Sequence, residues 1–464
     1  MPTDLDEMFI ALGRQADTLP LGPAASARRR GRQRTRTRAA LAAAAAVCLI
    51  TGGLAVTTTH RRADPSPAAS PLPTVGKPIV FGGTARNVTT AISGATAYAV
   101  WVAPDGKTNV AGADLRTGAE RFPAHALGTF NQVNVVRALP KAVVVDVQED
   151  MDRMLYILDP ATGEQRWKLP LADGDDHVYY ENDLVHMKMK TGETRAFDWA
   201  TGDETWRQPA GADPVVHTVG MRMEADAPRA GFSDPRLIQL TKGNRVLIRD
   251  AATGKSLGNV PGQIAWGDPY LAYEGTLYTV VPLHYTEAKK VWSSYLIRET
   301  DLTAPYLSRS VRSGPAGRAL QALAPCGRGK LCVLDTLDSA NQLASIDIGA
   351  SAENWRVDAP PTAFSLESSG GRVLAVGGRS NALYDTDGKQ VLLPEDLAGA
   401  HVGWIGSAAV LSLSTSGEVA KVLVENGDRE VIGSVPPGTT AWAWNNERLV
   451  AATPTEMRVL DLGG

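Results

Sequence analysis

Asp159-Pro-Ala-Thr-Gly-Glu-Gln-Arg-Trp167 is the stretch of the chain that decides its fold. The apolar run before it, residues 154–158, has the composition of a β-strand. The Asp and Thr side chains can bond nearby backbone groups and hold a tight turn, and the Gly supplies a residue with positive φ. The tryptophan lies on the strand that follows, where we expect it to pack against a neighbouring unit. The stretch therefore predicts two strands joined by a tight turn.

The same phrase, D-x-x-T-G, recurs four times along the chain. Its members are Asp114, Thr117 and Gly118; Asp159, Thr162, Gly163 and Trp167; Asp198, Thr201, Gly202 and Trp206; and Asp250, Thr253 and Gly254. The glycines are 45, 39 and 52 residues apart, and looser copies follow near residues 301, 347, 385, 426 and 461. A strand-rich repeat of about 40 to 50 residues is typical of a β-propeller, in which each repeat is one four-stranded blade.

The fold class that we predict is all-β, with eight blades and a seven-bladed ring as the alternative. Nine turn signals are present, and the last lies at the C-terminus without room for an outer strand. Residues 78–81 at the start of the domain could supply that strand and close the ring. About 387 residues divided among eight blades give about 48 residues for each, which is ordinary for four strands. One of the weak copies is then not a blade.

A transmembrane α-helix is predicted ahead of the propeller. Residues 39–59 carry no charge, and at about 1.5 Å per residue a helix of that length crosses a bilayer core. Seven arginines lie within residues 28–38, whereas only Arg61 and Arg62 follow the segment. The positive-inside rule then places the N-terminus in the cytoplasm and the propeller outside the cell membrane.

The predicted tail contains one amphipathic stretch. Leu5, Met8, Phe9 and Leu12 recur at helical spacing and would share one face of a short helix. Two interpretations stay open: a docking peptide through which the protein signals, or a weakly ordered tail. The predicted organisation is a cytoplasmic tail at 1–38, a membrane helix at 39–59, a proline-rich linker at 60–77 and the propeller at 78–464.

The repeat resembles that of the PQQ-like, quinoprotein-type β-propellers, whose blades carry the phrase seen intact at 159–167 and 198–206. The whole plan is similar to membrane-anchored PQQ-like propeller proteins of actinobacterial type. The propeller also resembles that of the outer-membrane assembly lipoprotein, and this resemblance implies a non-catalytic scaffold for a protein, peptide or cell-envelope partner. Quinone-dependent dehydrogenases share the fold, but their adjacent cysteine pair has no counterpart among Cys48, Cys326 and Cys332.

Cys326 and Cys332 flank a glycine-containing turn between two strand-like runs. Outside the membrane such a pair is expected to be oxidised, so we predict a structural disulfide. Cys48 falls within the predicted membrane helix, where it is a small apolar residue.

The remaining polar residues predict no enzyme. Two acidic stretches, 146–152 and 173–177, lack the calcium-loop pattern and are interpreted as solvated turns. The seven histidines are scattered, and hydrolase and nucleotide-binding motifs are missing. A net charge of −3, from 47 basic and 50 acidic residues, offers no field for nucleic acid. We therefore assign no catalytic residue, no cofactor and no metal ligand.

Overall fold

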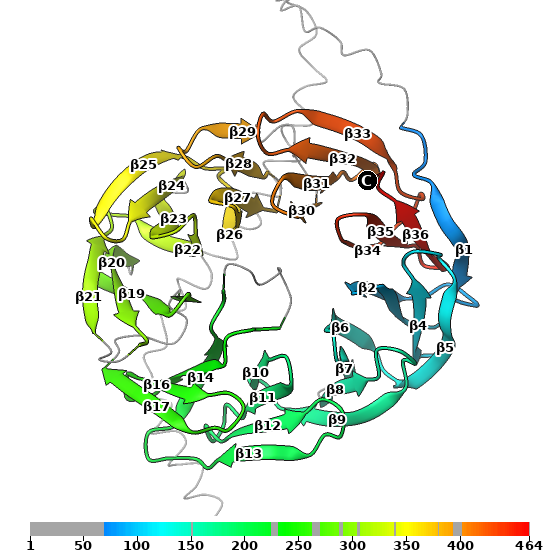
Figure 1. The fold of residues 1–464 in the computed structure, drawn as a ribbon, viewed down its shortest axis with the longest axis horizontal. Coiled ribbons are helices and arrows are strands. Elements are labelled where there is room, and N and C mark those ends of the chain that lie inside the picture. Colours follow the sequence, from blue (N-terminus) through cyan, green and yellow to red (C-terminus); the bar gives the residue numbers. More distant parts are fainter. Residues whose placement is uncertain are drawn as a thin grey trace, which may run out of the picture. The chain divides into compact units, whose positions relative to one another are not determined.

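The protein is a nine-bladed β-propeller. The computed structural model describes residues 69–149, 152–223, 231–261, 270–286, 291–303, 307–337, 340–378, 380–392 and 401–463. These residues form nine four-stranded antiparallel sheets arranged around a central opening (Figure 1). In eight sheets the strands follow one another in chain order from the centre outward.

The first five blades take up the N-terminal half of the ring. Their strands are β2 (Asn87–Ser93), β3 (Thr96–Val102), β4 (Lys107–Asp114) and β5 (Glu120–Thr129); β6 (Gln132–Ala138), β7 (Val143–Glu149), β8 (Asp152–Leu158) and β9 (Gln165–Leu171); β10 (Asp176–Tyr179), β11 (Asp183–Met187), β12 (Thr194–Asp198) and β13 (Glu204–Gln208); β14 (Val215–Gly220), β15 (Arg236–Thr241), β16 (Arg245–Asp250) and β17 (Ser256–Pro261); and β18 (Tyr270–Tyr273), β19 (Thr276–Thr286), β20 (Val291–Asp301) and β21 (Ser308–Ser313).

The last four blades complete the ring. Blades 6 to 8 comprise β22 (Ala319–Pro325), β23 (Lys330–Leu337), β24 (Ala340–Asp347) and β25 (Ala352–Asp358); β26 (Ala363–Ser369), β27 (Arg372–Gly377), β28 (Ala382–Tyr384) and β29 (Gln390–Leu392); and β30 (His401–Ile405), β31 (Ala409–Leu413), β32 (Glu418–Leu423) and β33 (Arg429–Ser434). Blade 9 comprises β34 (Ala441–Trp444), β35 (Arg448–Ala452), β36 (Glu456–Asp461) and β1 (Thr74–Val80).

The predicted count of eight blades, like the alternative of seven, is wrong. Eight turn signals lie between the third and fourth strands of a blade, and the ninth ends β36, the third strand of blade 9, so none of the weak copies is false. The blades average about 43 residues rather than 48, because strands such as β28 and β29 have only three residues each. The all-β propeller class itself is confirmed.

The ring is closed by its two ends. The N-terminal strand β1 pairs antiparallel with the C-terminal strand β36, from Thr74 opposite Leu460 to Val80 opposite Glu456, and the two lie side by side in Figure 1. Residues 78–81 were expected to supply this strand, and it begins four residues earlier, at Thr74. Before it, the backbone at Leu72 bonds to Ser434 of blade 8 at 2.9 Å. The chain therefore crosses the seam between blades 8 and 9 as it enters the ring.

The predicted tail and membrane helix, residues 1–59, lie outside the residues that the structure describes. Over the described part of the chain, no helix is long and apolar enough to cross a membrane.

The hydrophobic cores lie between neighbouring blades. Strand β3 is buried at every position, and its Val100 and Val102 share a cluster with Val143 and Val145 of the next blade. Each blade therefore buries its two faces against two neighbours, as sheets around a ring must.

The D-x-x-T-G turns have the predicted geometry. At Asp114 one carboxylate oxygen accepts the backbone N–H groups of Arg116 and Thr117 at 3.0 and 2.8 Å and the Thr117 hydroxyl at 2.9 Å. Gly118 donates its N–H to the Asp114 carbonyl at 2.8 Å with a φ of 64°. The same Asp–Gly bond closes the turns that begin at Asp159, Asp198 and Asp250. The phrase therefore builds turns, as expected.

After four of the turns, an aromatic residue packs on the glycine of the next blade's turn. A Cβ on Gly163 would lie 2.2 Å from the Phe122 ring, and one on Gly202 would lie 2.6 Å from the Trp167 ring. Trp206 covers Gly254 and Trp355 covers Gly388 in the same way. In each of these blades one residue before the aromatic is a β-bulge, for example Arg166, which turns the ring toward the neighbour. The tryptophans Trp167 and Trp206 are thus packing residues.

A repeated hydrogen bond joins the blades at the same place. The carbonyl of the residue after the turn Asp accepts a side-chain donor from the preceding blade. Trp167, Trp206 and Trp355 donate their indole N–H to Trp199, Ala251 and Thr386 at 3.1, 2.7 and 3.0 Å. Elsewhere the donors are the Tyr98 hydroxyl to Pro160 at 2.8 Å, and the guanidinium groups of Arg309 to Ile348 and Arg448 to Leu115, each at 3.1 Å. Among the described residues, six of the nine seams carry this bond.

Gly202→Ala should destabilise the ring far more than Gly438→Ala. Gly202 and Gly438 have φ angles of 75° and 79°, so the free-energy cost of placing alanine in this backbone conformation is about the same at both positions. Only at Gly202 does the new Cβ meet a ring, because among the described residues no atom lies within 4 Å at Gly438. We expect about 1 kcal/mol lost at Gly438 and about 3 kcal/mol at Gly202, from denaturant unfolding of the two variants. Equal losses would mean that the ring contact contributes nothing.

Candidate functional site

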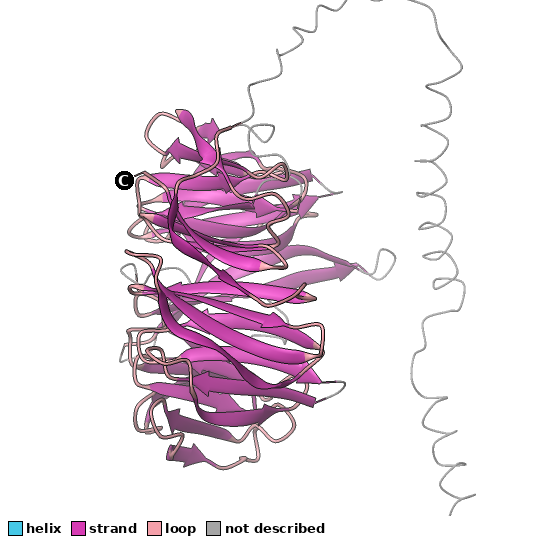
Figure 2. Ribbon diagram, turned by 90° about the vertical axis from the view of Figure 1, so that its right-hand side faces the viewer, coloured by secondary structure: helices cyan, strands magenta, loops and turns pink. Residues whose placement is uncertain are grey.

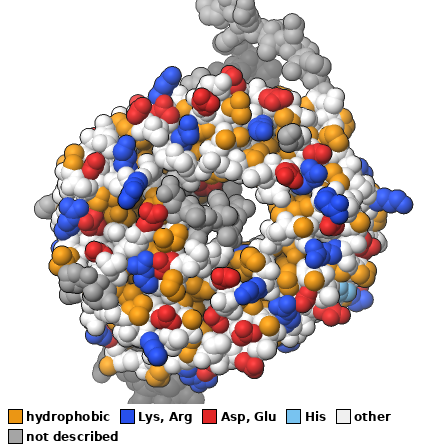
Figure 3. All heavy atoms as spheres, in the orientation of Figure 1, with side chains coloured by type: hydrophobic (Ala, Val, Ile, Leu, Met, Phe, Trp, Pro, Cys, Tyr) orange, Lys and Arg blue, Asp and Glu red, His pale blue; other side chains and the backbone are white. Residues whose placement is uncertain are grey.

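The nine innermost strands surround the central opening, which is the natural place for a ligand or a partner segment (Figures 1 and 3). Two smaller grooves lie elsewhere. One of about 540 Å³ runs between β1 and the start of β5, and one of about 190 Å³ lies between the turns of blades 5 and 6. The first is lined by Lys77, Ile79 and Glu120 among others, and the second by Tyr273, Tyr278 and Lys330 among others.

The connection from β14 to β15 reaches both neighbours of its own blade. Arg222 at one end bridges to Tyr273 of blade 5, and Phe232 at the other bridges to Tyr180 of blade 3. The Arg222 guanidinium lies 5.3 Å from the centre of the Phe232 ring, which ties the two ends together. This connection therefore links the inner edges of three consecutive blades.

A hydrogen-bonded chain of three side chains crosses the same three blades. Asp176 begins β10, His217 lies in β14 and Tyr270 begins β18. His217 Nδ1 lies 2.6 Å from the Asp176 carboxylate, and His217 Nε2 bonds the Tyr270 hydroxyl. The Asp176 carboxylate also accepts the backbone N–H of Thr218 at 2.9 Å. About a quarter of the Asp176 side chain and a third of the His217 side chain stay exposed.

The surroundings of this chain decide its protonation. Burial works to raise the pKa of Asp176, but the bonds and charge from His217 and the Thr218 N–H lower it below its usual value. Burial raises the pKa of Tyr270. An ionised Asp176 therefore accepts from His217 Nδ1–H, and His217 Nε2 shares a hydrogen bond with the neutral Tyr270 hydroxyl. The arrangement can bind a polar group and hold a proton, and it ties three blades together.

Two further histidines are buried between blades 2 and 3. His186 Nε2 lies 3.4 Å from the Asp175 carboxylate, and His186 stands opposite His177 on the neighbouring strand. Burial is the main cause that lowers the pKa of His186 to about 4, against the opposing charge of Asp175. Burial likewise lowers the pKa of His177. Both rings are thus neutral at pH 7, and their Nδ1 atoms have no bonding partner among the described atoms.

The interpretation of the two acidic stretches as solvated turns is wrong for Asp146 and Asp175. Asp146 lies inside β7, is 3% exposed and pairs with Arg153 at 2.5 Å. Asp175 is also buried, with 5% of its side chain exposed. Residues 150 and 151 lie outside the described residues. Sequence reasoning also missed His186, His217 and Tyr270, because their partners lie on other strands or other blades.

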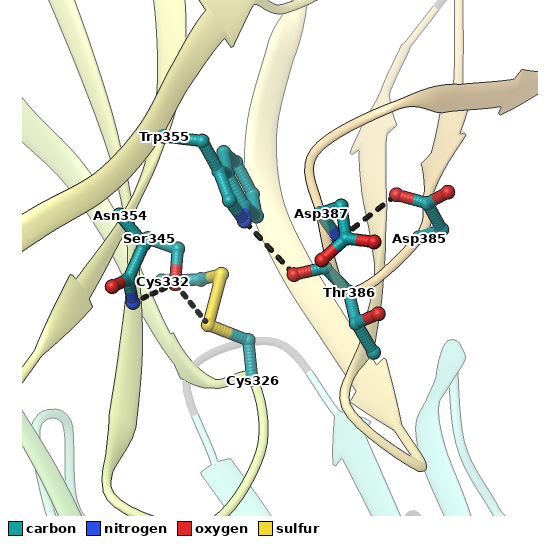
Figure 4. The surroundings of a disulfide bond; sticks show 8 residues. All are labelled: Cys326, Cys332, Ser345, Asn354, Trp355, Asp385, Thr386 and Asp387. Carbon is teal, nitrogen blue, oxygen red and sulfur yellow. Dashed lines mark hydrogen bonds between the residues drawn. A yellow bond between two sulfur atoms is a disulfide. The ribbon is translucent and has the colours of Figure 1, made fainter.

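Cys326 and Cys332 form the predicted disulfide, with Cα atoms 5.5 Å apart (Figure 4). It staples the turn between β22 and β23. The pairing is diagonal, because Cys332 stands opposite Ala324 in the register. Both cysteines are buried in the cluster that faces blade 7, next to Trp355. The bond stabilises the edge at which blade 6 meets blade 7.

Among the described residues, no three His, Cys, Asp or Glu side chains gather closely enough to hold a metal ion. The predicted turn residues are not brought together either: each set stays at its own turn on the ring.

Comparison with known proteins gives one family. The family model described as outer membrane protein assembly factor BamB matches residues 132–261 and 190–430, which together span more than half of the chain. Among solved structures, BamB from Moraxella catarrhalis is 14% identical, with 84% of this chain and 99% of that chain covered and a TM-score of 0.44. The computationally designed Ika8 protein is also 14% identical, with 83% and 100% covered and a TM-score of 0.45. No curated protein matches the chain.

Acid should destabilise the seam between blades 2 and 3 through His186. Its pKa is about 4 in the folded state and about 6.5 in the unfolded chain, so below pH 6.5 the unfolded chain binds the extra proton. Stability is therefore lost as the pH falls from 6.5 toward 4, by about 2 kcal/mol between pH 7.5 and pH 5. We expect His186→Gln to remove this part of the loss.

The measurement is denaturant unfolding of the wild type and His186→Gln at both pH values. Taking the difference between the two pH values for each protein cancels the cost of the substitution itself. An equal loss on acidification in both proteins would assign the acid sensitivity to other groups.

Proposed function

The chain belongs to the BamB-type family of PQQ-like β-propellers, and we propose from this membership that its propeller is a non-catalytic module that binds a protein, peptide or cell-envelope partner. One observation carries the non-catalytic part. The Asp, Gly and Trp residues that recur in each quinoprotein-type blade all have structural roles here. The Asp bonds within its turn, the Gly packs under an aromatic ring, and the Trp bonds to the next blade. The remaining surface of the ring is then open to a partner.

We further propose that residues 39–59 anchor the protein in the cell membrane, with the tail inside and the propeller outside. The support is the uncharged length of the segment and the arginines before it. On this proposal the partner is met in the cell envelope, and the linker that ends near β1 carries the ring away from the lipid surface.

A second candidate is a signalling regulator that acts through the tail. Leu5, Met8, Phe9 and Leu12 would form the apolar face that docks to a cytoplasmic protein. Binding outside would then be reported inside. This candidate shares the anchor with the first and differs in where the essential partner binds.

The disulfide provides a test of the compartment. If the propeller is extracytoplasmic, Cys326 and Cys332 are oxidised in living cells, since the cytosol keeps such pairs reduced. Trapping free thiols during lysis and reading the peptides by mass spectrometry should find both cysteines blocked until a reductant is added. Modification of both cysteines without reductant would place the domain in the cytosol.

Partner capture distinguishes the two candidate functions. Tagged full-length chain and a chain that lacks residues 1–26 but keeps the arginines are crosslinked in the membranes of the native cells. Captured proteins are then quantified by mass spectrometry. We expect the same partner with both chains, because the binding surface is on the propeller. A partner lost with the deletion would favour the signalling function, and loading with pyrroloquinoline quinone and calcium is the control for a dehydrogenase.

A further inference from the structure

In blade 5, two strands form a ribbon that extends beyond the other two strands of the sheet. Strands β19 and β20 have 11 residues each, and Figure 2 shows one such ribbon reaching past the other strands on one face of the ring. The inner strand β18 pairs only with residues 276–279 of β19, and the outer strand β21 only with residues 296–300 of β20. Beyond these points β19 and β20 pair with each other alone. The extension is about 15 Å long at 3.4 Å per residue.

The outer edge of β20 presents backbone groups in this extension. Tyr295 accepts the N–H of Gly314 at 2.7 Å, so its backbone groups point away from β19. Backbone direction alternates along an antiparallel strand, so Ser293 and Val291 point the same way. In the part of the chain that the structure describes, no strand pairs with the outer edge of β20, the edge away from β19, at these two residues. The edge therefore continues the row of groups that β21 uses, without a strand to meet it.

The sequence of this edge suits strand addition. Val291-Trp-Ser-Ser-Tyr295 contains no charged residue and no proline, which are the residues that commonly protect an exposed edge. The opposite edge of the ribbon is interrupted by Pro282, which has no N–H to give. Only the β20 edge thus offers a continuous set of donors and acceptors.

The pairing of the ribbon is regular to its end. Tyr285 stands opposite Trp292, and Thr286 opposite Val291. The pairing to β19 therefore holds the backbone of β20 in strand form along the whole extension, as an added strand requires.

We propose that the β20 edge of this ribbon, from Val291 to Ser294, receives an extended strand from a partner protein. The proposal rests on the proposed function and names where and how the partner binds, which is by main-chain pairing along this edge. Insertion of the ribbon into lipid does not fit, because unpaired backbone groups on an edge find no partner in hydrocarbon.

Ser293→Pro in the full-length chain is the test, with Ser293→Thr as the matched control. Proline removes only the N–H that points outward from β20, and an edge strand accepts it at such a position. Threonine keeps the N–H. Crosslinked membranes are analysed as above, and recovery of the wild-type partner is compared. We expect at least a tenfold loss with Ser293→Pro and a change within twofold with Ser293→Thr, at unchanged unfolding midpoints.

Val291→Lys against Val291→Thr provides a second pair, should proline alter the unfolding midpoint. A charge at the edge opposes strand addition while the bond pattern to β19 is kept. Equal partner recovery by wild type, Ser293→Pro and Val291→Lys would overturn the proposal and leave the proposed function standing. Recovery of no protein by the wild type itself would overturn the proposed function as well. Recovery of only lipid, or of only a second copy of this chain, would overturn the claim that the added strand comes from a different protein.

Discussion

In six blades of this ring, one backbone carbonyl is satisfied by a side chain of the preceding blade rather than by its own sheet. The turn Asp gathers the N–H groups of its turn, and the glycine N–H returns to the Asp carbonyl, which leaves the next carbonyl directed at the preceding blade. A buried carbonyl without a partner costs about 1 to 3 kcal/mol. A donor from the neighbour removes that cost at six seams, so adjacent blades stabilise one another through a polar contact as well as through their apolar cores.

The acceptor of this contact is always the carbonyl after the first turn residue, whereas the donor group varies. Indole, phenol and guanidinium groups all serve as the donor, from the second, third or fourth residue of an outer strand or from strands nearer the centre. In blade 8 the first turn residue is Leu423 rather than Asp, yet Gly427 still donates to its carbonyl at 2.9 Å. Beyond residue 254 the repeat fades in sequence, and in blade 8 the backbone form of the turn is kept without the Asp.

This difference explains what could be predicted. The four intact phrases and their tryptophans were sufficient for the propeller class, the turn geometry and the packing role of Trp167 and Trp206. The blade number was not predictable from average blade length, because blades as short as the one with three-residue β28 and β29 are balanced by blade 5 with its 11-residue strands. The Asp176–His217–Tyr270 chain was equally hidden, since its members come from three blades and each has an ordinary polar neighbourhood in sequence. The ribbon had no signal other than two long β-rich runs.

Closure by β1 and β36 has a consequence for how the molecule is made. The first strand of the ring is synthesised before any blade, and its pairing partner is synthesised last. At about 5 to 20 residues per second, the nascent strand waits on the order of a minute for its partner. Throughout that time Ile79 and Phe81 can pack only on blade 1, because Val450 and Val459 of blade 9, which complete their core, are not yet made. Contacts so distant along the chain also form slowly. The protein is therefore most exposed to aggregation during its synthesis. A chaperone that covers β1 until β36 is made would protect the most vulnerable segment.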